Sequence, residues 1–340
     1  MSAQLELQSL TKIYGPRPER ALKELGAGIS KSELLDQTGH VLGVHDVNLR
    51  IDAGELFVIM GLSGCGKSTL VRLINRLVEP SAGRILLDDK DVTAMTSREL
   101  VRMRRRRMSM VFQSFALLPQ RTVLDNAAFG LEVAGVTRAE RRRRAMEALE
   151  LVGIAEVASH LPEQLSGGMR QRVGLARAWV TEPDVMLMDE AFSALDPLIR
   201  TEMQDALVDL QRKHRRTIVF ISHDLSEAAR IADRIAVMAD GGIRQVGTAA
   251  EIINHPADDY VRAFFRDVQP GRLFTAGDIA VPGGVDGEAL RVSSHALLED
   301  ILPQAAASEV PLAVMDDNGG CVGRIERSTL LKALARREAP

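Results

Sequence analysis

One nine-residue segment limits the fold of this chain more than any other feature. Residues 61–69 read Gly-Leu-Ser-Gly-Cys-Gly-Lys-Ser-Thr, which is a G-x-x-x-x-G-K-[ST] pattern. An apolar run, Leu56–Met60, precedes it and an apolar helical pattern over 70–77 follows it. A phosphate-binding loop requires this order of strand, loop and helix. The sequence therefore predicts an α/β fold with a nucleotide site at the end of a buried strand.

The residue types of this loop suit a polyphosphate and a magnesium ion. Glycines let backbone N–H groups curve around the phosphates at a helix N-terminus. The Lys67 ammonium is expected to reach the β- and γ-phosphates, and the Ser68 hydroxyl to ligate Mg²⁺. The predicted nucleotide-binding residues of the loop are Gly61, Ser63, Gly64, Cys65, Gly66, Lys67, Ser68 and Thr69.

A second apolar run, 185–188, ends in two adjacent carboxylates, Asp189 and Glu190. Ligand-binding groups gather at the carboxyl ends of parallel strands. Neighbouring residues on a strand point to different sides, so Asp189 is predicted to support the metal while Glu190 faces an attacking water.

A second anion-binding device is predicted over 165–172. Ser166, Gly167 and Gly168 precede a helical pattern that ends before Pro183, so they lie where helix N–H groups bind anions. This segment resembles the signature motif of ATP-binding cassette (ABC) ATPases and lies 23 residues before Asp189.

Further segments match the ABC pattern in the same order along the chain. The resemblance implies a γ-phosphate sensor that also ligates the metal at Gln113, and a switch histidine at His223 that acts with Glu190. It also implies a loop over 193–196 that places Asp196 at the nucleotide, and adenine stacking on Tyr14. By the same resemblance, Ser166 and Gly168 are expected to complete the nucleotide site of a partner subunit.

Three longer segments, 112–135, 189–204 and 258–266, resemble the ATPase subunits of glycine betaine, proline betaine and choline importers, as does an insertion after Tyr14. The resemblance covers residues 4 to about 267. It implies a homodimeric ATPase that uses ATP and Mg²⁺ and docks on an integral membrane permease. It also implies a separate substrate-binding protein, a peripheral position on the cytoplasmic face of the membrane, and inward movement of quaternary amines.

The expected fold has three parts within residues 1–266: a mixed-sheet core, an antiparallel β subdomain and a helical signature subdomain. Alternating apolar residues near the N-terminus predict antiparallel strands, and a capping box at Ser30 and Glu33 predicts a helical insertion over 16–40. Four compact apolar runs predict buried parallel strands; they begin at residues 56, 185, 218 and 235.

A Gly- and Pro-rich stretch, 267–289, is expected to link this domain to a small α+β module over 290–340. The module resembles a single cystathionine β-synthase (CBS) repeat, chiefly in residues 311–331. A strand, an acidic turn, a second strand and a capped helix are also what the spacing predicts. Its apolar residues Leu312, Val314, Val322 and Ile325 are expected to share one face, and the module is expected to regulate.

Composition excludes several classes of protein. Two cysteines are too few for a disulfide framework or a four-cysteine metal site, and no apolar stretch is long enough to span a bilayer.

The formal net charge is only −3, yet residues 102–144 hold eleven arginines against Asp125, Glu132 and Glu140. Such a block could face nucleic acid or anionic lipid. The alternative is a pair of solvated helices, with the apolar residues 108–111 continuing the first of them.

Alternatives to the betaine importer stay open from the sequence. One is an importer ATPase for another solute class, because this subunit does not touch the solute. A second is an ABC ATPase that acts on nucleic acid, for which the arginine block would be the contact, although no nucleic-acid partner is expected. A third is a regulatory module that only binds ATP, in which an intact Glu190 and His223 would be unnecessary.

Overall fold

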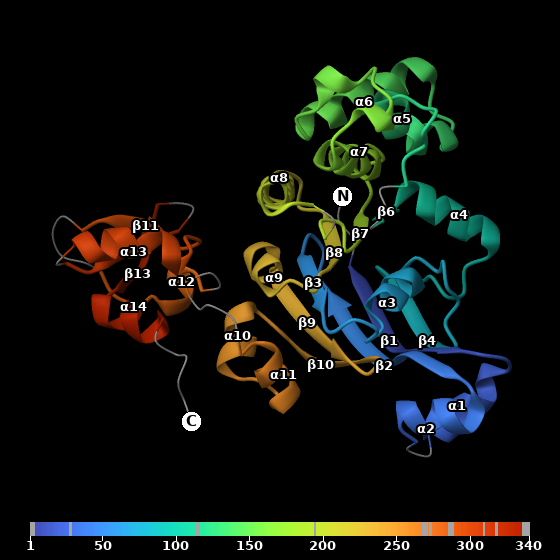
Figure 1. Ribbon diagram of the computed structural model, residues 1–340, viewed down its shortest axis with the longest axis horizontal. Coiled ribbons are helices and arrows are strands. Elements are labelled where there is room, and N and C mark those ends of the chain that lie inside the picture. Colours follow the sequence, from blue (N-terminus) through green and yellow to red (C-terminus); the bar gives the residue numbers. More distant parts are fainter. Residues whose placement is uncertain are drawn as a thin grey trace. The chain divides into compact units, whose positions relative to one another are not determined.

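The structure is a computed structural model that describes residues 4–26, 29–112, 116–193, 195–266, 271, 274–284, 289–308, 310–316 and 319–334. The chain divides into two compact units (Figure 1). The first comprises residues 1–223 and 236–244, and the second comprises 224–235 and 245–340. Among the described helices, none combines the length and the apolarity that crossing a bilayer demands.

A six-stranded sheet forms the centre of the first unit. Its central strands pair in parallel, β3 with β8 and β8 with β7, and every residue of these three strands is buried. Complete burial on both faces explains why they appear in the sequence as short continuous apolar runs. The order across the sheet is β10 (Gly242–Gly247), β9 (Arg234–Ala239), β3 (Leu56–Met60), β8 (Thr217–Ile221), β7 (Val185–Asp189) and β6 (Met108–Val111).

Strand β6 corrects the sequence interpretation of residues 108–111. These residues pair in parallel with β7 and do not extend the preceding helix α4 (Ser97–Arg106). Met108 and Val111 are buried, and a four-residue buried strand cannot be distinguished from a helix segment by periodicity alone.

A second sheet is antiparallel, as predicted. β1 (Leu5–Tyr14) lies between β2 (Val41–Ile51) and β4 (Ala82–Leu87), and the two-residue strand β5 (Lys90–Asp91) completes the sheet. Between β1 and β2 the chain forms α1 (Pro18–Gly26) and α2 (Lys31–Thr38), whose apolar residues pack on Leu42. The Ser30 and Glu33 capping box predicted for this insertion is present.

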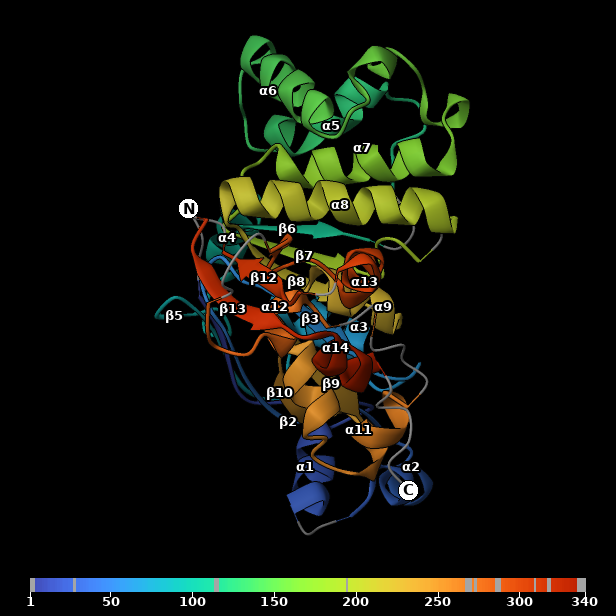
Figure 2. The ribbon, with the colours of Figure 1, turned by 90° about the vertical axis from the view of Figure 1, so that its left-hand side faces the viewer.

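The remaining helices of the first unit include two that follow strands of the six-stranded sheet and a separate helical group. Helix α3 (Lys67–Ile74) follows the phosphate-loop sequence directly, and α8 (Pro197–His214) follows β7. The helices α5, α6 and α7 pack against one another, and α7 and α8 run side by side in Figure 2. Their bounds are α5 (Val123–Val133), α6 (Arg138–Leu151) and α7 (Gly167–Trp179), with short 3₁₀ turns at Ala155–Val157 and Pro162–Gln164.

The second unit contains a separate three-stranded sheet. The order is β11 (Arg291–Ser293), β12 (Leu312–Met315) and β13 (Cys321–Ile325), with β11 parallel and β13 antiparallel to β12. Its helices are α9 (Leu225–Ile231), α10 (Ala249–Asn254), α11 (Asp259–Phe264), α12 (Ala276–Ile279), α13 (Leu298–Ala307) and α14 (Arg327–Leu334).

Residues 274–281 lie within the stretch expected to be a linker, and they contribute to the core of the second unit. Phe274 and Ala276 are buried there, and Val281 pairs with Arg324 of β13. The domain boundaries 266/267 and 289/290 stay predictions. Val322 does not share the buried face of Leu312 and Val314, since it is 47% exposed.

Candidate active site

Three glycines of the 61–69 loop adopt backbone conformations that other residues avoid. The φ angles of Gly61, Gly64 and Gly66 are 150°, 78° and 110°. A Cβ on Gly61 would lie 2.2 Å from the Met238 carbonyl oxygen, and one on Gly66 would lie 2.1 Å from the Gly43 carbonyl oxygen. The loop is therefore packed tightly against two neighbouring segments, and its curvature depends on glycine.

The Lys67 side chain lies inside this loop. It is 5% exposed, and its Nζ donates hydrogen bonds to the carbonyl oxygens of Gly61 at 2.8 Å and Leu62 at 3.0 Å. These bonds fold the ammonium into the curve of the loop, beside the N-terminus of α3. A cation and a helix N-terminus at one point create a favourable site for phosphate.

Ser68 and Asp189 meet at the carboxyl edge of the parallel sheet. The Ser68 hydroxyl donates a 2.9 Å hydrogen bond to Oδ1 of Asp189, which is almost completely buried. Arg72, one turn further along α3, places a guanidinium nitrogen 3.8 Å from Oδ2 of the same carboxylate. A hydroxyl and a carboxylate at this separation fit a shared hard cation such as Mg²⁺, which prefers oxygen ligands.

Among the described residues, no group of three or more His, Cys, Asp or Glu side chains could hold a metal ion. A magnesium site at Ser68 and Asp189 therefore depends on further oxygens from a nucleotide, as is usual for Mg²⁺ in phosphoryl-transfer enzymes.

Glu190 follows Asp189 in a left-handed conformation with φ 47°, which is uncommon for a residue other than glycine. Its carbonyl oxygen accepts hydrogen bonds from the backbone N–H and the hydroxyl of Ser193, which hold the turn. Nδ1 of His223, directly after β8, lies 3.8 Å from Oε1 of Glu190. The structure thus places Glu190 and His223, two of the predicted catalytic residues, together at the edge that carries Asp189.

Tyr14, at the end of β1, lies beside the helix that carries Lys67. Its hydroxyl is 3.3 Å from the Thr69 hydroxyl, and a Cβ on Gly43 would lie 2.9 Å from its ring. Nζ of Lys12 lies 5.0 Å from the ring centroid. Tyr14 is 39% exposed, so part of its side chain is accessible to solvent beside the loop.

The signature segment lies at the N-terminus of α7. The Ser166 hydroxyl accepts a hydrogen bond from the Met169 N–H, and Gly167 has open space around its Cα. Gly168 packs against α8, because a Cβ there would lie 2.5 Å from Cγ2 of Ile199. The Asp196 carboxylate accepts a hydrogen bond from the Ile199 N–H, so Asp196 caps α8.

No hydrogen bond or ion pair among the described residues joins Ser166, Gly168 or Asp196 to the phosphate loop. Gln113 and Ala194 lie outside the described residues. The site residues that one chain gathers are therefore those of the loop, Asp189, Glu190, His223 and Tyr14.

Two residues of this site were missed from the sequence. Arg72 lies four residues after Ser68, so both lie on one face of α3, and this spacing could have indicated it. Gly43 interrupts an apolar strand pattern, and an isolated glycine in a strand indicates the close approach of another segment. Here the approaching segments are Gly66 and the ring of Tyr14.

Comparison with known proteins agrees with this geometry. The family model for ABC transporters matches residues 44–193. The glycine betaine/proline betaine transport system ATP-binding protein ProV of Escherichia coli is 58% identical over 287 residues, covering 84% of this chain and 72% of ProV. The trimethylamine N-oxide transport system ATP-binding protein TmoW of Ruegeria pomeroyi is 44% identical over 332 residues, covering 98% of this chain and 97% of TmoW.

A solved structure shows the same fold. The dimeric post-hydrolysis state of the ATP-binding cassette MJ0796, bound to ADP and Pi, matches with a TM-score of 0.61 and 31% identity. The match covers 72% of this chain and 98% of the MJ0796 chain. These matches confirm the ABC-type P-loop ATPase fold and the ATP-binding function predicted from the sequence. The chain belongs to the ATP-binding subunits of ABC transporters, in the group that includes the glycine betaine and proline betaine transport systems.

Proposed function

We propose that this chain hydrolyses ATP to drive the uptake of glycine betaine or proline betaine through a separate membrane subunit. The meeting of Ser68 and Asp189 at 2.9 Å, beside the loop that holds Lys67, carries the catalytic part of this proposal. The 58% identity to ProV carries the choice of solute. The position is peripheral, on the cytoplasmic face of the membrane, and a substrate-binding protein supplies the solute.

Each residue has a role that follows from its place. Lys67 and the loop N–H groups bind the phosphates, and Ser68 and Asp189 hold Mg²⁺, which when bound neutralises charge on the phosphate oxygens. Glu190 orients the attacking water and accepts its proton, and His223 positions the Glu190 carboxylate. The resemblance to ABC ATPases gives Gln113 the role of a further metal and γ-phosphate ligand, and the exposed ring of Tyr14 would stack on adenine.

The functional unit is a homodimer. The MJ0796 cassette is a dimer in its solved structure. In the proposed dimer, Ser166, Gly167, Gly168 and Asp196 of one subunit complete the nucleotide site of the other. The open space at Gly167 and the exposed Ser166 N-cap support this role, because a partner's nucleotide can approach there.

The small module over 290–340 regulates the ATPase domain. Its strand and helix order, β11, α13, β12, β13 and α14, supports its assignment as one CBS-like repeat. We assign residues 1–266 to the ATPase domain, 267–289 to the connection and 290–340 to this repeat.

A second candidate solute is trimethylamine N-oxide. TmoW of Ruegeria pomeroyi matches this chain over 98% of its length, whereas ProV matches 84%. Glycine betaine and trimethylamine N-oxide both carry a trimethylated cationic nitrogen and an anionic oxygen. The ATPase subunit cannot discriminate between them, because the solute passes through other subunits.

Reconstitution tests the function. The chain is purified with its membrane subunit, placed in vesicles and supplied with the substrate-binding protein. ATP-dependent uptake of glycine betaine, proline betaine, choline and trimethylamine N-oxide is then compared. Uptake of a betaine supports the proposal, and uptake of trimethylamine N-oxide alone supports the second candidate. Copurification with RNA in place of a membrane protein would contradict both.

A further inference from the structure

The insertion between β1 and β2 reaches the phosphate loop through one side chain. Nζ of Lys31, the first residue of α2, donates a hydrogen bond of 3.4 Å to the carbonyl oxygen of Gly64. Within the described residues, no other hydrogen bond or ion pair joins residues 16–40 to residues 61–69. Lys31 is therefore the polar connection between the insertion and the loop.

The charge of Lys31 does not suit its own helix. A cation at a helix N-terminus is disfavoured, because the first N–H groups of the helix carry partial positive charge. The end of α2 is already capped, since the Ser30 hydroxyl accepts a hydrogen bond from the Glu33 N–H and the Glu33 carboxylate accepts one from the Ser30 N–H at 2.9 Å. Lys31 thus adds nothing to the cap, and residues that oppose the local preference are expected where function requires them.

Lys31 also borders open space. A hollow of about 820 Å³ is lined by Lys31 and Leu35 of α2 on one side and by Asp240 and Arg244 on the other. The only acidic residue that lines it, Asp240, pairs with Arg244 at 3.1 Å. No carboxylate in the described part of the chain pairs with Lys31. Its ammonium is therefore not neutralised within the hollow and contacts the loop carbonyl instead.

Gly64 is a loosely restrained point of the loop. Its φ angle is 78°, and a Cβ on this residue would meet no atom within 4 Å. The N–H of the next residue, Cys65, donates to the Leu62 carbonyl oxygen at 3.3 Å. The C=O and N–H groups of a planar trans peptide point in opposite directions. Lys31 and Leu62 therefore hold the two ends of the peptide unit between Gly64 and Cys65.

We propose that Lys31 is a positioning residue for ATP binding, which holds the Gly64 carbonyl and keeps the phosphate loop curved before the nucleotide arrives. Lys67 holds the carbonyl oxygens of Gly61 and Leu62 from within the loop, and Lys31 holds the next part of the loop from the insertion. A loop that is ordered in advance loses less conformational entropy on binding. This inference rests on the proposed ATPase function and gives the insertion a part in it.

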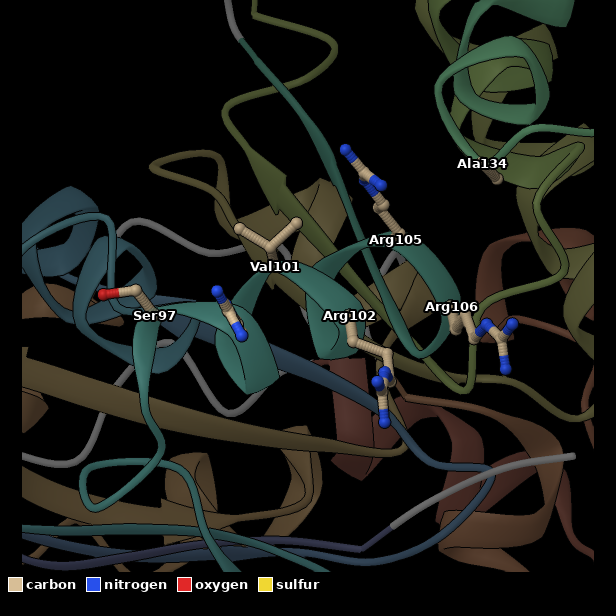
Figure 3. A pocket seen from close by; sticks show the side chains of 7 residues that line it. Ser97, Val101, Arg102, Arg105, Arg106 and Ala134 are labelled. Atoms are coloured by element: carbon tan, nitrogen blue, oxygen red, sulfur yellow. The ribbon is translucent and has the colours of Figure 1, made fainter.

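The arginine-rich block of residues 102–144 does not supply this contact. The α6 arginines 141–144 lie beside carboxylates of this chain. On α4, Arg102 and Arg106 line a separate hollow of about 550 Å³, and Figure 3 shows them projecting from the helix, with Ala134 on another segment. None of these arginines forms a hydrogen bond with residues 61–69 in the described part of the chain. Arg102 therefore provides a control for net charge alone.

Four variants of the full-length chain test the proposal. Lys31→Met removes the ammonium and keeps the aliphatic stem, whereas Lys31→Arg keeps a charged N–H donor. Lys23→Met is the matched control on the insertion, because Lys23 is exposed on α1 and forms no hydrogen bond or ion pair among the described residues. Arg102→Met is the control for net charge. KM and kcat for ATP hydrolysis are measured, together with amide hydrogen exchange of residues 61–69 without nucleotide.

Lys31→Met should raise the KM for ATP roughly three- to tenfold, because one hydrogen bond from a charged group is lost. The kcat should stay within about twofold, because the bound triphosphate itself orders the loop at saturation. The loop amides should exchange faster in Lys31→Met than in either control. Lys31→Arg should stay close to the wild type in KM and in exchange. The thermal stability of Lys31→Met should be unchanged or slightly raised, since the variant removes a cation from a helix N-terminus.

Three results would overturn the proposal. Equal KM values in Lys31→Met and Lys23→Met would remove Lys31 from ATP binding. A raised KM with unchanged loop exchange would indicate that Lys31 touches the nucleotide directly, and a lowered thermal stability of Lys31→Met would indicate that Lys31 only stabilises the insertion. Absence of ATP hydrolysis in the wild-type chain would contradict the proposed function before any variant is compared, so the two failures are distinguishable.

Discussion

The six-stranded sheet and the three-stranded sheet of this protein bury their residues differently. The strands β3, β7 and β8 are buried on both faces, and their carboxyl ends carry Lys67, Asp189, Glu190 and His223. In the second unit, β11 and β13 each expose residues to solvent, and the large apolar side chain of Val322 on β13 is 47% exposed. A doubly covered sheet holds reacting groups rigidly, whereas a half-covered sheet keeps a surface for interaction. We therefore assign chemistry to the six-stranded sheet and propose a regulatory role for the three-stranded sheet.

The largest effect on ATP hydrolysis is expected for Glu190→Gln. Removing the carboxylate that positions water should lower ATP turnover on the order of a hundredfold or more, while ATP binding is retained. ATP hydrolysis and nucleotide binding are measured separately. Glu182→Gln is the matched control, because Glu182 has a similar backbone conformation, with φ 49°, and pairs with Arg144 at the surface. Unchanged hydrolysis in Glu190→Gln would remove Glu190 from the catalytic role.

Mixed dimers test whether the first unit needs a second copy. Gly168→Asp and Lys67→Ala should each abolish hydrolysis, since the former forces a side chain against Ile199 and the latter removes the loop cation. An equal mixture should recover roughly a quarter of the wild-type sites, because each hetero-dimer keeps one site free of both changes. Hydrolysis is measured against protein concentration. An inactive mixture that forms hetero-dimers by light scattering would contradict the shared sites.

Tyr14 tests the edge of the nucleotide site. Tyr14→Ala should raise the KM for ATP roughly tenfold through loss of one aromatic stacking contact. Tyr14→Phe keeps the ring and loses only the hydroxyl beside Thr69, so its KM should stay close to that of the wild type. Similar KM values in both variants would indicate that Tyr14 only packs against Gly43.

The smallest effect on catalysis is expected from the three-stranded sheet. Leu312 is 1% exposed in its core, so Leu312→Ala should lower the free energy of unfolding of the second unit by about 2–5 kcal/mol. Basal ATP hydrolysis should stay within about twofold, because no catalytic residue belongs to this sheet, while its salt dependence in the membrane complex should change. Leu331→Ala, at an exposed position, is the control. Loss of basal hydrolysis in Leu312→Ala alone would show that the second unit supports catalysis directly.

Sequence patterns predicted the parallel strands because burial on both faces makes them continuously apolar, and they predicted the site because the loop, Asp189 and Glu190 follow such strands directly. β6 was missed because a four-residue, partly buried segment after an arginine run fits a helix as well as a strand. Val322 was misplaced because alternation within β13 puts it opposite Gly323 and Ile325. Arg72 and Gly43 depend on contacts between distant segments, which local periodicity does not report.

Cys65 is buried within the phosphate loop, so the reactivity of its thiol reports opening of that loop. Its sulfur lies 3.9 Å from Nζ of Lys67 and is almost completely covered, whereas Cys321, the other cysteine of the chain, has an exposed side chain. Thiol reagents can reach Cys65 only when the loop opens, since reactivity requires access. In a chain with Cys321→Ser, the rate of alkylation therefore becomes a clock for loop opening. Alkylation rates of the Cys65 sulfur, measured without nucleotide, with ATP and with ADP, would then compare how often the loop opens in each state.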